Sequence, residues 1–236
     1  MRFFRLFISL IYSIYPHFVC SYEPTGHLDD CQFDIITYSA AFDLFPEGHG
    51  KILTLGLLQE SILKLRIRFP HIEIDRWEQE INPIGKYDAF IIFLGLEKNG
   101  NRNEILKAFH KALKPGKKGV VFCTPKNTFS LDNLTEGYLE ISLWKKQISS
   151  TPILSITEYK VLCEKIGFLI ESERQSVGVI RIDDSINDWI CERWEIPESI
   201  QASFIIGFNR FLEEKFNNQS ILFLDIYRLL LIKDES

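Results

Sequence analysis

The chain has 236 residues, of which 46% are hydrophobic and 25% are charged, and its formal net charge is -5 at pH 7. This composition is typical of a folded protein with a sizeable core, for which a single domain is sufficient. The acidic balance argues against a general nucleic-acid binder, because such proteins neutralise phosphates with clustered lysine and arginine.

The cysteines and histidines indicate no metal site and no disulfide framework. The cysteines are far apart, odd in number and without a Cys-x-x-Cys pair, and the histidines lack the spacing of metal ligands. Reduced thiols in a cytoplasmic protein are the simpler interpretation. The five cysteines are Cys20, Cys31, Cys123, Cys163 and Cys191.

The first twenty residues combine two arginines with an apolar run, as a signal peptide does. However, polar residues interrupt the run, it is too short to span a bilayer, and no small-x-small cleavage site precedes Pro16. We therefore predict an N-terminal helix and linker over 1–31, with the helix docked on the rest of the protein. A helix that binds a membrane surface or a partner, and a secretory signal, remain alternatives.

From residue 32 to the end, helix and strand signals alternate, which predicts a layered α/β domain. Gly167 is expected to end the last helix of this pattern and Thr157 to cap its start, while Asn101 caps an earlier one. We predict helices at 34–45, 58–69, 101–113 and 157–166. We predict strands at 51–56, 71–78, 87–96, 120–125, 168–182 and 220–236.

Three of these segments resemble class I S-adenosylmethionine-dependent methyltransferases. Residues 86–125 resemble the fourth strand, helix and fifth strand of that family, and the turn "LKPGKKGVV" is the most specific element. Residues 156–176 resemble its late helix and sixth strand, and 220–236 its antiparallel seventh strand. The resemblance covers 32–236 and implies a Rossmann-like sheet that is mostly parallel with an antiparallel last strand.

The sequence is too short for the complete family pattern. Gly56 and Asp88 are 88 - 56 = 32 positions apart, and one strand–helix–strand unit takes about thirty residues. The family has two such units before its fourth strand, so one strand–helix pair is missing. We assign the absence to the second strand, because 72–90 matches the third strand and its following loop better.

The resemblance implies an S-adenosylmethionine site around the first strand end, here in a degenerate form. Gly56 occupies the first position of a glycine-rich loop, but large residues follow where small ones are expected. Gly56 could equally serve an ordinary strand-to-helix turn. Asp75 is a candidate ribose ligand or an ordinary solvated or capping aspartate.

Other candidate site residues have equally ordinary alternatives. Trp77 and Phe93 fall where adenine-stacking or pocket-lining groups lie in the family, beside Leu94 and Gly95, but aromatic residues at such positions are more often core. His49 is a weak candidate for a general base, although Gly-His-Gly is also good turn chemistry.

A helical insertion at 183–219 is unusually aromatic. Its side chains could line an apolar pocket for a small molecule, form a docking face for a protein partner, or pack against the sheet. They are Trp189, Trp194, Phe204, Phe208, Phe211 and Phe216.

Two functions from different classes compete on this sequence. In the first, the S-adenosylmethionine site no longer binds, no cofactor is needed, and the protein is a non-catalytic binding or partner module. In the second, it is an S-adenosylmethionine-dependent methyltransferase that acts on a small apolar molecule, largely by alignment. A related fold with different chemistry is a third possibility, because fold does not fix function.

Overall fold

The computed structural model describes residues 40–41, 43–45, 48–57, 59–77, 84–93, 96, 101–146, 148, 152–181, 187, 190–191, 194–216 and 221–234. The predicted N-terminal helix and linker over 1–31 lie outside this part of the chain, as do Leu58, Leu94, Gly95 and Trp189. Of the predicted helix at 34–45, residues 40–41 and 43–44 are described and are helical.

Six strands form one sheet in the order β2-β1-β3-β4-β6-β5. β1, β2, β3 and β4 pair in parallel, whereas β6 runs antiparallel to both of its neighbours. The expectation of a mostly parallel sheet with an antiparallel last strand is therefore confirmed. The strands are β1 (Gly50–Leu55), β2 (Ile72–Arg76), β3 (Tyr87–Phe93), β4 (Leu113–Cys123), β5 (Phe168–Arg181) and β6 (Ile221–Lys233).

The strand order identifies which part of the doubly wound pattern is absent. In that pattern the second strand pairs with the first, and the third lies outside it. β2 pairs with β1 from Ile72 to Arg76 and so takes the place of the second strand. Only residues 77–86 join β2 to β3, too few for a further strand and helix. The link between β2 and β3 therefore contains no further strand–helix pair, and our assignment of 72–90 to the third strand is wrong.

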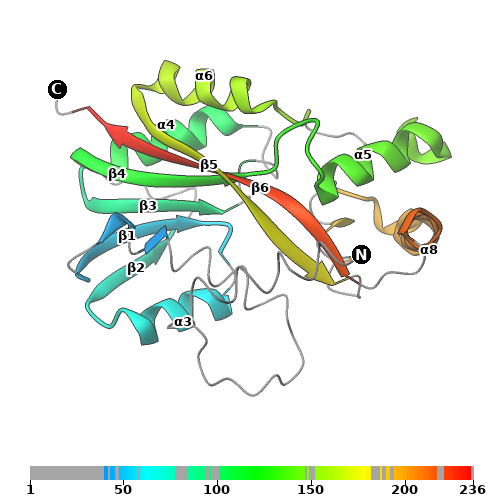
Figure 1. Ribbon diagram of the computed structural model, residues 1–236, viewed down its shortest axis with the longest axis horizontal. Helices are drawn as coiled ribbons and strands as arrows, with labels where there is room; N and C mark the ends of the chain where they lie inside the picture. Colours follow the sequence, from blue (N-terminus) through cyan, green and yellow to red (C-terminus); the bar gives the residue numbers. More distant parts are fainter. Residues whose placement is uncertain are drawn as a thin grey trace, which may run out of the picture.

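Helices cover both faces of the sheet and its carboxyl end (Figure 1). α3 (Gln59–Arg68) packs on one face, while α4 (Arg102–Ala112) and α6 (Ile156–Ile166) pack on the other. α5 (Leu131–Ile141) and α8 (Glu198–Phe216) lie beyond the ends toward which β3 and β4 run, with the short 3-10 helix η1 (Leu143–Lys146) after α5. Within the described residues, no helix is long and apolar enough to cross a membrane.

Two helix starts differ from their predictions. Asn101 stands at the N-cap of α4, but its side chain makes no capping hydrogen bond. Ser155, rather than Thr157, caps α6: its hydroxyl accepts a hydrogen bond from the Glu158 backbone, and the Glu158 carboxylate accepts one from the Ser155 backbone. The end of α6 is as predicted, because Gly167 adopts a left-handed φ of 105° there.

β4 begins earlier than its sequence suggests. We predicted that 114–119 is a turn, but the strand starts at Leu113. Its pairing with β3 jumps from Tyr87–Leu113 to Ala89–Lys118, so the segment between these two pairs bulges out of the ladder. The bulge, which contains Gly116 at φ 69°, accommodates the proline and glycine that look like a turn.

The aromatic insertion packs mainly against α5. Trp194, Phe204 and Phe208 are at most 1% exposed and belong to a core cluster shared with α5. The Tyr138 ring of α5 lies 5.5 Å from both phenylalanine rings. The helices approach closely at Gly207, where a Cβ atom would lie 2.2 Å from the Tyr138 hydroxyl. These three side chains are therefore unavailable as a docking face.

Candidate functional site

The topology puts a candidate ligand site at the carboxyl ends of β1 and β3. The chain leaves β1 for β2 on one side, whereas β3 pairs on the other side. Ligands of open α/β sheets bind in the crevice outside such a switch point. Gly56 follows β1, Phe93 ends β3 and Trp77 follows β2, so three of the predicted site residues share this edge.

The turn after β1 is built around Gly56. This residue is exposed and has a φ of 81°, a left-handed conformation that favours glycine. Leu57 is only 4% exposed and belongs to the core beneath α3, together with Ile62 and Leu65. The Leu57 side chain therefore packs between strand and helix instead of filling the space outside the strand end.

Trp77 and Phe93 lie on opposite faces of the sheet. Trp77 packs against the core on the α4 side, where its ring is 6.0 Å from Phe109. Its indole nitrogen is buried without a hydrogen-bond partner among the described residues. Phe93 packs against the core on the α3 side, 5.3 Å from Phe122. The two rings therefore do not form one stacking platform.

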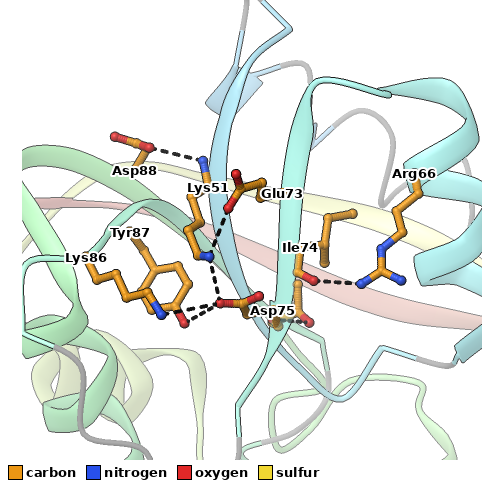
Figure 2. A network of polar contacts seen from close by, with 9 residues as sticks. Lys51, Arg66, Glu73, Ile74, Asp75, Lys86, Tyr87 and Asp88 are labelled. Atoms are coloured by element: carbon orange, nitrogen blue, oxygen red, sulfur yellow. Dashed lines mark hydrogen bonds and ion pairs between the residues drawn. The ribbon is translucent and has the colours of Figure 1, made fainter.

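Asp75 belongs to a polar network on the α4 face of the sheet (Figure 2). The Tyr87 hydroxyl donates a 2.8 Å hydrogen bond to its carboxylate, and the Lys51 ammonium lies 3.1 Å away. Lys86 adds a weaker ion pair at 3.8 Å. Because Lys51 and Tyr87 stand at the amino ends of β1 and β3, this carboxylate is engaged away from the carboxyl edge.

The network shifts the pKa values of Asp75 and Tyr87. Burial raises the pKa of Asp75, but hydrogen bonds from Tyr87 and Lys51, with the lysine charges, outweigh burial and lower the pKa overall. Burial, followed by the hydrogen bond to Asp75, raises the pKa of Tyr87 to about 12. At neutral pH a charged carboxylate is thus held by a neutral phenol and by ammonium groups.

Arg76 occupies the place where an acidic ribose ligand is expected, at the end of β2. Its Nη2 donates to the Leu57 carbonyl at 3.0 Å and its Nη1 to the Gln59 Oε1 at 3.2 Å. The guanidinium thus holds the segment that follows β1. The role of Arg76 was not predicted from the sequence, because an arginine that ends an amphipathic strand usually faces solvent.

His49 lies away from this edge. It is exposed and directly precedes β1, whereas Gly56 directly follows it. A strand of six residues spans roughly 20 Å at about 3.3 Å per residue. The structure therefore does not bring His49 together with Gly56, Trp77 and Phe93. No group of His, Cys, Asp or Glu in the described part of the chain could hold a metal ion.

Comparison with solved structures identifies the fold. A protein assigned as a sarcosine dimethylglycine methyltransferase from Galdieria sulphuraria matches with a TM-score of 0.55 and 12% identity, over 96% of this chain and 98% of that one. This chain has the class I methyltransferase fold. No protein-family profile and no curated protein sequence matches it.

Two further structures with the class I methyltransferase fold show how varied its uses are. The [4+2]-cyclase SpnF matches with a TM-score of 0.53 and 12% identity, over 100% of this chain and 95% of that one. A Haloferax volcanii protein assigned as a methyltransferase, solved with the Trm112 methyltransferase activator, matches with a TM-score of 0.50 and 11% identity. That match covers 88% of this chain and 92% of the other. At these identities the likeness establishes the fold and leaves function to the site.

Proposed function

We propose that this protein is a non-catalytic member of the methyltransferase fold, which works through a protein partner and has lost the recognition of S-adenosylmethionine. The observation that carries the proposal is the pair of residues at the end of β2. Asp75 is bound by Lys51 and Tyr87, and Arg76 holds the segment after β1. The Arg76 guanidinium can only donate hydrogen bonds, so it cannot accept the ribose hydroxyl hydrogens that a carboxylate at this position would accept.

A specific observation keeps the catalytic alternative testable. The buried indole N–H of Trp77 has no acceptor among the described residues, and the Leu57 side chain packs in the core beneath α3. A ligand with a hydrogen-bond acceptor at the carboxyl edge would satisfy that donor. The second candidate is therefore an S-adenosylmethionine-binding enzyme that acts on a small apolar molecule.

Calorimetric titration of the full chain with S-adenosylmethionine and S-adenosylhomocysteine separates the two functions. We expect no binding at millimolar ligand. Binding at micromolar ligand would refute the non-catalytic proposal. In that case Trp77→Phe, which keeps the ring and removes the N–H, tests whether the indole is the ligand's donor.

The variant Asp75→Asn tests the role assigned to Asp75. We expect a loss of about 1 kcal/mol in the free energy of unfolding at pH 7, because a partly exposed charge-assisted network is weakened. Since folding lowers the pKa of Asp75, the loss should be present above about pH 4 and disappear as the pH falls through the folded pKa.

Tyr87→Phe is the matched variant for this network, because it removes only the hydroxyl that donates to Asp75. It should lower the free energy of unfolding, as Asp75→Asn does. Denaturation curves of both variants from pH 3 to pH 7 measure the two losses. If the wild type binds S-adenosylmethionine and a stably folded Asp75→Asn protein does not, Asp75 is instead a ribose ligand.

A further inference from the structure

The backbone groups of β2 alternate between its neighbour and its outer edge. The Trp77 amide donates to the Thr54 carbonyl, and the Gly50 amide donates to the His71 carbonyl. In a parallel pair, this pattern directs the amides and carbonyls of residues 71, 73, 75 and 77 toward β1. The corresponding groups of Ile72, Ile74 and Arg76 therefore point outward.

This outer edge is only partly occupied. The Ile72 amide donates to the Phe69 carbonyl, and the Ile74 carbonyl accepts a 2.9 Å hydrogen bond from Arg66 of α3. Figure 2 shows Arg66 reaching across to this carbonyl. Among the described residues, no strand pairs with this edge and no group bonds the Ile74 amide or the Ile72 carbonyl. An unpaired edge of this kind is a template for another strand.

An apolar strip of α3 borders the edge. Leu63 is 48% exposed and Ile67 is 82% exposed, and they lie one helical turn apart. Arg66, which bonds the Ile74 carbonyl, is three residues from Leu63 and adjacent to Ile67. The strip therefore flanks the edge of the sheet on which the described part of the chain has no outer strand.

The edge also carries positive charge, although the whole chain is acidic. Arg66 and Arg76 are exposed, and neither forms an ion pair with a carboxylate in the described part of the chain. The exposed acidic residue of β2, Glu73, is already paired with Lys51. The complementary surface is therefore an acidic one.

We propose that the outer edge of β2 and the Leu63–Ile67 strip bind an extended acidic segment of a protein partner, which adds a strand to the sheet. Its main chain would pair with the Ile74 amide and the Ile72 carbonyl, and its apolar side chains would cover the strip. Arg66 would exchange the Ile74 carbonyl for a carboxylate of the partner. This inference deepens the partner role proposed above and names its surface.

The test uses the full chain and a fluorescent peptide of alternating leucine and glutamate. Fluorescence anisotropy should show binding that weakens with salt. Ile67→Glu should weaken it at least tenfold, because it places a like charge on the strip. The matched control is Ile206→Glu on α8, where the isoleucine is 71% exposed but far from this edge in the fold; its affinity should equal that of the wild type.

Amide hydrogen exchange at Ile74 decides how the peptide binds. Strand addition predicts that this amide exchanges rapidly in the dilute protein and slowly in the presence of the peptide. Absence of peptide binding, or binding that leaves Ile74 unprotected, overturns the proposal. Protection in the dilute free chain would show that the chain covers its own edge, and protection that grows with protein concentration would show a second copy there.

Two further outcomes distinguish this inference from a polyanion site at the same edge and from the non-catalytic function proposed above. Single-stranded DNA that binds as tightly as the peptide, with no effect of Ile67→Glu, would make the edge a polyanion site and refute the protein partner. Micromolar binding of S-adenosylmethionine with peptide binding intact would refute the non-catalytic proposal and leave the assignment of the edge standing.

Discussion

Gly119 lies in β4 directly beside the ring of Phe90 in β3. A Cβ atom at Gly119 would lie 2.2 Å from two carbons of that ring, and Phe90 is only 1% exposed. Because the ring cannot move into solvent, we expect Gly119→Ala to reduce the free energy of unfolding by about 1–3 kcal/mol through overpacking. Urea denaturation monitored by circular dichroism measures the loss.

Gly137 in α5 provides the matched control. A Cβ atom there would meet nothing within 4 Å, and alanine is preferred over glycine inside a helix by about 0.5–1 kcal/mol. Gly137→Ala should therefore stabilise the protein. Equal effects of the two substitutions would contradict the close packing of Gly119 on Phe90.

The same scale shows what the sequence can reveal about the site. The family resemblance made Gly56, Trp77 and Phe93 site candidates, and the structure places them at the carboxyl ends of β1, β2 and β3, with the two aromatic rings on opposite faces of the sheet. The direction of the Asp75 side chain depends on how β2 aligns with β1 and β3, because its partners come from those strands. Single-sequence patterns carry no information on that alignment.

At the scale of elements, the start of α6 distinguishes two neighbouring hydroxyl residues. Ser155 makes a reciprocal capping box with Glu158, whereas Thr157 is exposed within the first turn. We expect Ser155→Ala to reduce the free energy of unfolding by about 1 kcal/mol and Thr157→Ala to have little effect. Thermal denaturation compares them, and a larger loss from Thr157→Ala would support the cap predicted from sequence.

The elements that sequence analysis missed have local explanations. In β4 the signals of Pro115 and Gly116 are those of a turn, but the strand contains them in a bulge. α5 was not predicted, although Ser130 caps it and its apolar residues have helical spacing. Its buried face contacts the insertion before β6, far along the chain, which makes its packing invisible to local patterns.

At the scale of the molecule, the structure contains a sheet core and a separate helical core. The residues on the two faces of the sheet form two clusters, and α5, α8 and the segment before α8 form a third. The alternation of helices and strands predicted a layered α/β sheet, as observed. It could not predict that the aromatic insertion would build a core with α5, because that depends on tertiary contacts.

This division predicts that the helical core can open while the sheet stays folded. Phe208 is fully buried in the helical core and contacts Tyr138, Phe204 and Phe211. Removing a buried phenylalanine ring costs about 3–5 kcal/mol. We expect the substitution to lower mainly the free energy of opening the helical core locally. Phe208→Ala should therefore accelerate amide hydrogen exchange in α5 and α8 while the amides of β3 and β4 stay protected.

Phe90→Ala is the counterpart in the sheet core, where the Phe90 ring contacts Phe109 and Phe168. Because these contacts join β3 to α4 and β5, we expect this substitution to accelerate exchange across the whole sheet. Hydrogen exchange followed by mass spectrometry compares both variants with the wild type. If Phe208→Ala exposes β3 and β4 as much as α5 and α8, the two cores unfold as one unit, and the helical layer could not change its packing for a ligand or partner without loss of the fold.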